Sequence, residues 1–154
     1  MTVRNSNSVK LLMMIVATIL PMLLQAKTID IILPNSFSLE WHDVSNLPAG
    51  AKLAILSGNP MKREFYVARL KLPAHFTIPP HSHLTNEYNT VISGIYYLGI
   101  GDKIKNGNTI PLPVGSFITF PAGAMHYGFT KEEVILEISG IGPWGTMPKK
   151  LMNK

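Results

Sequence analysis

The 154-residue chain contains no cysteine. Disulfides, thiolate metal sites, redox-active cysteine pairs and cysteine nucleophiles are therefore excluded, and so is lipid anchoring through a cysteine. Without disulfides, the folded chain has to rely on its hydrophobic core for stability. Any metal ion that it binds must be held by nitrogen and oxygen atoms.

Charge is also scarce, because charged residues make up only 15% of the chain and the formal net charge is +5. No basic stripe with interleaved aromatic residues is present, so we expect no nucleic-acid partner. A cluster formed by Lys149, Lys150 and Lys154 is interpreted as a solvated tail. The apolar fraction of 46% and the chain length are typical of one globular domain.

The only long apolar run lies near the N-terminus. Residues 11–24, LLMMIVATILPMLL, carry no charge, follow Arg4 and Lys10, and precede the small residue Ala26. A basic segment, an apolar run of about 14 residues and a small residue are typical of a secretory signal peptide. The run is shorter than the roughly 20 residues that a membrane span needs, and Pro21 interrupts it.

We therefore expect residues 1–26 to be a cleaved signal peptide and residues 27–154 to form a single exported domain. Loss of the two basic residues would lower the net charge from +5 to +3. The expected location is the periplasm or the medium, without stable membrane association after cleavage. An uncleaved N-terminal anchor is one alternative, and a core helix is the other.

Helical periodicity is lacking outside this segment, where no apolar pattern of helical period continues beyond about two turns. Twelve glycines and twelve prolines divide the chain into short runs rich in β-branched and aromatic residues. These runs are TIDIIL, FSLEWHDV, KLAILSG, EFYVARLKL, EYNTVIS, GIYYLGI, SFITF, MHYGFT and EVILEIS. Each predicts a strand, and about nine or ten short strands predict an all-β sandwich or jelly roll.

Two local patterns add detail to the all-β prediction. Residues 64–72 alternate as a strand buried on one face should, with Tyr66, Ala68, Leu70 and Leu72 on one side and Arg69 and Lys71 on the other. Asn106-Gly107 predicts a two-residue hairpin turn that links DKIK to NTIPL.

The candidate site residues are histidines, of which the chain has five: His42, His75, His81, His83 and His126. Nothing near His42 or His75 completes a ligand set, so both are interpreted as ordinary polar residues. His81 and His83 differ because residues two apart on a strand point to the same face. Pro79 and Pro80 hold the preceding backbone extended, and Glu87 follows. This spacing alone leaves open a metal site or ordinary polar residues on a sheet.

A second cluster lies at residues 115–126, GSFITFPAGAMH. A predicted strand ends at Pro121, a turn containing Gly123 follows, and His126 opens the next predicted strand.

Together the two clusters resemble the two motifs of the cupin superfamily. The first, His-x-His, three residues, Glu, six residues, Gly, is met by His81, His83, Glu87 and Gly94. The second, Gly, five residues, Pro-x-Gly, two residues, His, is met by Gly115, Pro121, Gly123 and His126. Two positions depart from the pattern: the glycine expected six residues before the first histidine is His75, and the asparagine often found four after the last is Thr130.

The resemblance implies a double-stranded β-helix (the cupin jelly-roll barrel) over residues 27–154, similar to the small exported single-domain cupins, with the metal motifs within residues 81–126. It implies a metal ion held by His81, His83, Glu87 and His126, and a homodimer. Aromatic residues near the motifs are candidates for the pocket lining: Tyr88, Tyr96, Tyr97, Phe117, Phe120, Tyr127 and Trp144.

Three neutral imidazoles and one carboxylate suit one divalent transition metal, such as Mn, Fe, Co, Ni, Cu or Zn, and disfavour Ca and Mg. Four protein ligands would leave coordination positions open, which is typical of catalytic metal sites. We expect an enzyme that oxidises, decarboxylates or isomerises a small oxygen-rich organic molecule. A non-catalytic module that binds a small molecule, sugar or metal is the alternative, and an interaction or structural protein is a third. No general acid or base stands out beyond the ligands.

Overall fold

The structure of the protein is a computed structural model that describes residues 39–105 and 107–148. Within these residues every regular element is a β-strand, which confirms the all-β prediction. Accordingly, no helix in this part of the chain could cross a membrane. The expected signal peptide, the run TIDIIL and the start of FSLEWHDV lie outside the described residues.

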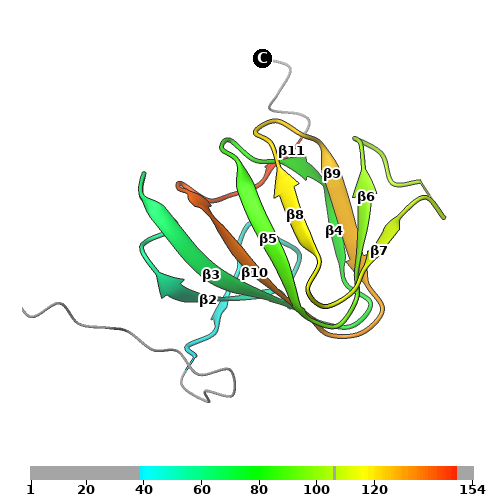
Figure 1. Ribbon diagram of the computed structural model, residues 1–154, viewed down its shortest axis with the longest axis horizontal. Coiled ribbons are helices and arrows are strands. Elements are labelled where there is room, and N and C mark those ends of the chain that lie inside the picture. Colours follow the sequence, from blue (N-terminus) through cyan, green and yellow to red (C-terminus); the bar gives the residue numbers. More distant parts are fainter. Residues whose placement is uncertain (1–38, 106, 149–154) are drawn as a thin grey trace, which may run out of the picture. The chain divides into compact units, whose positions relative to one another are not determined.

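The strands form two antiparallel sheets (Figure 1). In order across the first sheet they are β1 (His42–Asp43), β2 (Lys52–Ser57), β3 (Phe65–Leu72), β10 (Val134–Ile141), β5 (Glu87–Ser93) and β8 (Phe117–Phe120). The second sheet contains β11 (Met147–Pro148), β4 (Thr77–Ser82), β9 (His126–Thr130), β6 (Tyr96–Ile100) and β7 (Ile110–Leu112). From β3 to β6 and from β7 to β11 the chain changes sheet at every connection, as in a jelly roll.

The core lies between the inner faces of the sheets. β3 and β10 pair along their whole length and bury every second side chain. Their buried residues are Tyr66, Ala68, Leu70, Leu72, Val134, Leu136 and Ile138. The predicted alternation of residues 64–72 is therefore confirmed, and it occurs because successive side chains of a strand point to opposite faces of the sheet.

The predicted pairing of DKIK with NTIPL is wrong. Residues 102–105 form no strand, and β7 pairs instead with β6, with Tyr96 opposite Leu112 and Leu98 opposite Ile110. A turn does occur at the predicted place, since the Asn108 N–H donates to the Lys105 carbonyl at 3.2 Å. The Asn106-Gly107 signal concerns only the turn itself. The partner of β7 depends on which strand edge lies beside it in the folded protein, and this is the edge of β6.

His75 and Thr130, the two residues that depart from the cupin motifs, are both involved in the turn between β3 and β4. His75 has a φ of 57° there, a conformation that glycine adopts more readily than other residues. Thr130 Oγ1 donates to the Pro73 carbonyl at 2.6 Å and accepts the Phe76 N–H at 3.0 Å. The Thr130 N–H also donates to the Phe76 carbonyl. Thr130 thus fixes the turn in which His75 stands.

Candidate metal centre

Three of the predicted ligands converge inside the barrel. His81 on β4 stands directly opposite His126 on β9 in the sheet register, and His83 follows the last residue of β4. The ring centroids are 4.3 Å apart for His81 and His126, 5.0 Å for His81 and His83, and 5.1 Å for His83 and His126. One ligand atom from each lies within 4.8 Å of the others, so the three buried histidines could hold a metal ion.

The strands that carry these residues differ in part from the expectation. His83 lies just beyond the end of β4, so His81 and His83 do not share one strand. Glu87 opens β5, which belongs to the other sheet. The site is therefore built across the two sheets, because the chain crosses between them in the short connection after His83.

The orientation of each imidazole is set by a backbone carbonyl. His81 Nδ1 lies 2.8 Å from the Pro79 oxygen, and His126 Nδ1 lies 2.9 Å from the Ala124 oxygen. His83 Nδ1 lies 3.2 Å from the Gly145 oxygen. A carbonyl can only accept, so each Nδ1 carries the hydrogen and each Nε2 keeps its lone pair, as a metal ligand requires.

Residues 115–126 hold both His83 and His126 in place. The Gly123 N–H donates to the His83 carbonyl at 2.9 Å, within a turn where Gly123 has a φ of 77°. The ring of Phe120 stacks on that of His126, with centroids 3.9 Å apart and an interplanar angle of 15°. The strand end and turn that the sequence predicted between residues 115 and 126 therefore fix two of the three histidines.

Glu87 lies in the same chamber but is held mainly by hydrogen-bond donors. Its Oε2 accepts the Trp144 indole N–H at 2.7 Å and lies 3.5 Å from His83 Nδ1. Asn89 and Tyr66 also donate side-chain hydrogen bonds to this carboxylate. The set of mutually close ligand atoms comprises the three histidines, so ligation by Glu87 stays a prediction.

Burial shifts the pKa values of these groups toward their neutral forms. It lowers the pKa of His81 to about 4, that of His126 to about 3, and also that of His83. Burial raises the pKa of Glu87 to about 6, against the opposing effect of its hydrogen-bond donors. Neutral imidazoles at neutral pH are the form that binds a metal ion.

The chamber itself fits an ion. It has a volume of about 20 Å³, which is enough for one water-sized species. Two buried polar atoms of residues that line it, His83 Nε2 and Asn89 Oδ1, have no hydrogen-bond partner among the described residues. An unpaired imidazole nitrogen beside two further imidazoles fits a metal ion, because burial without a partner costs free energy that ligation would recover.

Three of the seven aromatic candidates line the chamber: Tyr96, Phe120 and Trp144. Tyr88 and Phe117 are exposed instead, and their rings stack on the outside of the first sheet. His42 and His75 lie away from the chamber and are exposed, in agreement with their interpretation as ordinary polar residues.

Sequence reasoning missed Asn89 and Tyr66. The available signal was the strand period: Asn89 stands two residues after Glu87 and so shares its face of β5. Tyr66 lies on the predicted apolar face of β3, where a phenol needs a buried acceptor, and Glu87 provides one. The strand period therefore identifies the faces on which Asn89 and Tyr66 lie, but it does not identify Glu87 as their hydrogen-bond partner.

Comparison with solved structures identifies the class. RemF, a polyketide cyclase from Streptomyces resistomycificus, superposes with a TM-score of 0.63 at 17% identity, covering 79% of this chain and 86% of RemF. An RmlC-like cupin from Shewanella frigidimarina NCIMB 400 gives 0.54 at 16% identity, with 73% and 86% covered. A structure of the DMSP lyases RdDddP and RnDddQII gives 0.52 at 19%, with 68% and 57% covered.

The protein therefore has the cupin fold, as its motifs predicted. More particularly, the chain belongs to the family described as domain of unknown function DUF4437, whose model matches residues 25–140. No curated protein matches it.

Proposed function

We propose that the protein is a metal-dependent enzyme that acts on a small oxygen-containing organic molecule by oxidation, decarboxylation or isomerisation. One divalent transition metal ion would be held by His81, His83 and His126, with Glu87 as the fourth ligand. The observation that carries the proposal is the arrangement of the three imidazoles, each with its Nδ1 bound to a backbone carbonyl and its other nitrogen left for a metal.

The residues present suit Mn, Fe, Co, Ni, Cu or Zn, because imidazole nitrogen is the dominant ligand and Glu87 would supply one negative charge. A bound metal would supply Lewis-acid or dioxygen chemistry. The chain's own residues position the imidazoles, exclude bulk water from the chamber and keep Glu87 hydrogen-bonded. In the metal-free chamber, burial raises the pKa of Glu87 to about 6, and as a metal ligand its carboxylate would be ionised.

The fold neighbours support an enzyme in general terms, since a polyketide cyclase and DMSP lyases share this fold. Because RemF and the DMSP lyases are less than 20% identical to this chain, their substrates are not assigned to it. The alternative function, a non-catalytic binding module, draws support from the size of the chamber, which leaves room for an ion and little else.

Elemental analysis tests the metal centre. The protein, purified without chelators and offered Mn, Fe, Ni, Cu and Zn in turn, should retain one of them at about one ion per chain. His126→Ala should lose most of that metal, whereas His75→Ala, which removes an exposed histidine, should keep it. Equal metal contents in the two variants, or none in the wild type, would contradict the proposal. Oxygen uptake or carbon dioxide release from candidate substrates would then favour the enzyme over the binding module.

We further propose that the protein is exported to the periplasm or the medium after cleavage behind Ala26, and that it forms a homodimer. The composition of residues 1–26 supports the first proposal and the cupin resemblance supports the second. N-terminal sequencing of protein from outside the cytoplasm should begin at Lys27; an intact Met1 in the membrane fraction would indicate the anchor instead. Light scattering at known concentration would test the dimer.

A further inference from the structure

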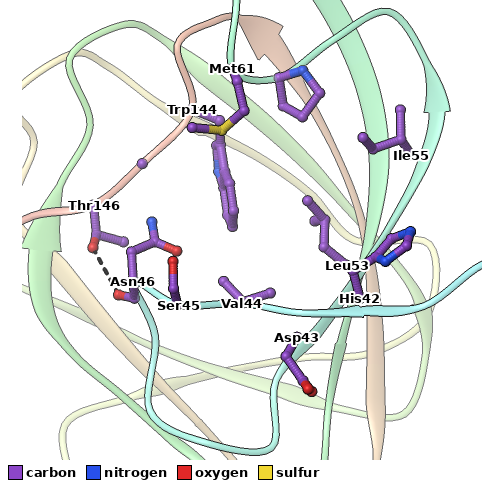
Figure 2. Close-up of a pocket in the computed structure, with 12 residues that line it drawn as sticks. His42, Asp43, Val44, Ser45, Asn46, Leu53, Ile55, Met61, Trp144 and Thr146 are labelled. Carbon is purple, nitrogen blue, oxygen red and sulfur yellow. Dashed lines mark hydrogen bonds between the residues drawn. The ribbon is translucent and has the colours of Figure 1, made fainter.

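A second cavity adjoins the metal chamber. It has a volume of about 430 Å³, within the range of small-molecule sites. Figure 2 shows the Trp144 indole reaching into this cavity, with Val44 and Leu53 facing it and Met61 beside it. Ile55 closes a further side. Apart from its rim, the lining is thus made of large apolar side chains, which favour an apolar occupant.

Trp144 is the wall that the two cavities share. Its side chain lines both the chamber and the apolar pocket, as does that of Thr146. The backbone N–H of Trp144 donates to the Pro60 carbonyl at 2.6 Å, and its indole N–H donates to Glu87. Thr146 Oγ1 donates to the Asn46 carbonyl at 3.2 Å (Figure 2). Trp144 and Thr146 therefore lie between the pocket and the predicted ligands, and the Trp144 indole is the larger of the two side chains.

The chamber is too small to hold a whole organic substrate. A space of about 20 Å³ admits an ion or a water molecule, whereas an organic substrate needs a volume at least ten times larger. Only an end group of such a substrate could enter the chamber. The rest of the molecule has to lie in an adjoining space, of which the described residues offer two. The pocket behind Trp144 has about 430 Å³, and a cavity along Pro79 and Pro80, which shares His81 with the chamber, has about 390 Å³. The pocket behind Trp144 carries the larger apolar side chains, so it is the better site for an apolar body.

The charges around the pocket limit what it can hold. Its one carboxylate, Asp43, lies at the exposed rim and is paired with Lys52 at 3.1 Å. Among the described residues, the lining contains no lysine or arginine, and its one histidine, His42, is exposed with its Nε2 4.0 Å from Glu40 Oε2. An anionic group inside the pocket would therefore lack a buried cationic partner. Ser45 and Asn46 border it with uncharged polar groups. The lining thus selects an uncharged molecule with an apolar body.

We propose that this pocket binds the apolar body of an uncharged small molecule with an oxygen group at one end, and that displacement of the Trp144 indole lets this oxygen reach the three histidines. The second part rests on the proposed function, because the oxygen needs a metal to bind. The proposal replaces the oxygen-rich substrate expected from the sequence with a mostly apolar molecule that carries oxygen at one end.

Butylbenzene and para-butylphenol provide the test, because they share an apolar body and differ by one hydroxyl. Both should bind the purified protein in equilibrium dialysis. Ile55→Arg, which places a charge at a half-exposed position of the lining, should weaken both by about tenfold or more. Ile100→Arg, the same change at an exposed position of β6 away from the pocket, should stay within about twofold.

Zinc tests the connection to the histidines. One equivalent of Zn²⁺ should raise the preference for para-butylphenol over butylbenzene by about fivefold or more, since only the phenol can ligate the ion. An unchanged preference in protein that retains zinc would overturn the connection. Failure of both probes to bind, or equal effects of the two arginine variants, would show that the pocket is no binding site, for example because another segment fills it. Loss of zinc binding alone would refute the metal centre and leave the pocket standing.

Discussion

Trp144 donates its indole N–H to the Glu87 carboxylate at 2.7 Å, although 57 residues separate the two in the chain. The next residue, Gly145, offers its carbonyl to His83 Nδ1. The segment after β10 therefore closes the metal chamber and also orients two of its predicted ligands. A site of this kind depends on the groups behind the ligands as well as on the ligands themselves.

Trp144→Phe should weaken metal binding by about tenfold. The variant keeps an aromatic ring and removes the indole N–H, so Glu87 loses a donor that favours its ionised form. A competition titration of Zn²⁺ against a chromophoric chelator measures the affinity. Trp41→Phe is the matched control, because its ring lies beside Lys71, on a different element. Equal affinities for the two variants would show that this hydrogen bond does not support the site.

The metal-free protein should lose stability as the pH falls from about 6.5 to about 4. The pKa values of His81, His83 and His126 are lowered in the folded state, so below pH 6.5 the unfolded chain binds up to three more protons at these positions. Glu87 affects stability in the opposite direction. Because its pKa is raised to about 6, the folded state binds one more proton at this position than the unfolded chain between about pH 4.5 and 6.

In this range the unfolded chain therefore binds about two more protons than the folded state. The free energy of unfolding should then fall by up to about 2.7 kcal/mol for each pH unit of acidification. Urea denaturation of chelator-treated protein at several pH values measures the slope. A free energy of unfolding that stays constant, or that rises toward pH 5, would contradict the pKa shifts.

Thr130→Val should lower the free energy of unfolding by about 1–3 kcal/mol. Valine has nearly the same shape, but it leaves the Pro73 carbonyl and the Phe76 N–H without their hydroxyl partner in a buried turn. Thr119→Val, at an exposed position of β8, is the control and should change stability by less than about 0.5 kcal/mol. Chemical denaturation of the two variants would show whether the hydroxyl holds the turn.

His75→Gly should raise the free energy of unfolding by about 0.5–1 kcal/mol. The φ of 57° at this position costs a residue with a Cβ about 1–2 kcal/mol, and the greater freedom of glycine in the unfolded chain takes back part of the gain. His75→Ala keeps the Cβ and should bring no gain. A stabilisation by alanine as large as that by glycine would attribute the effect to the imidazole instead.

Much of the fold could be predicted because strand patterns are local. The run EYNTVIS matches β5 from its first residue to its last, and the alternation in residues 64–72 gave the buried face of β3. A strand was expected around His81 and His83, but the start of β4 at Thr77 was not predicted because Pro79 and Pro80 interrupt the usual composition of a strand.

The sequence by itself determined the class of the protein, the buried faces of its strands and the three histidines of the candidate site, because side-chain period and motif spacing are properties of short segments. Only the tertiary structure decided that Glu87 comes from the opposite sheet, that β7 pairs with β6, and that Trp144, of seven aromatic candidates, stands between the chamber and a second pocket. These relationships join residues far apart in the chain, and they arise when the two sheets close over a common core, which no local pattern encodes.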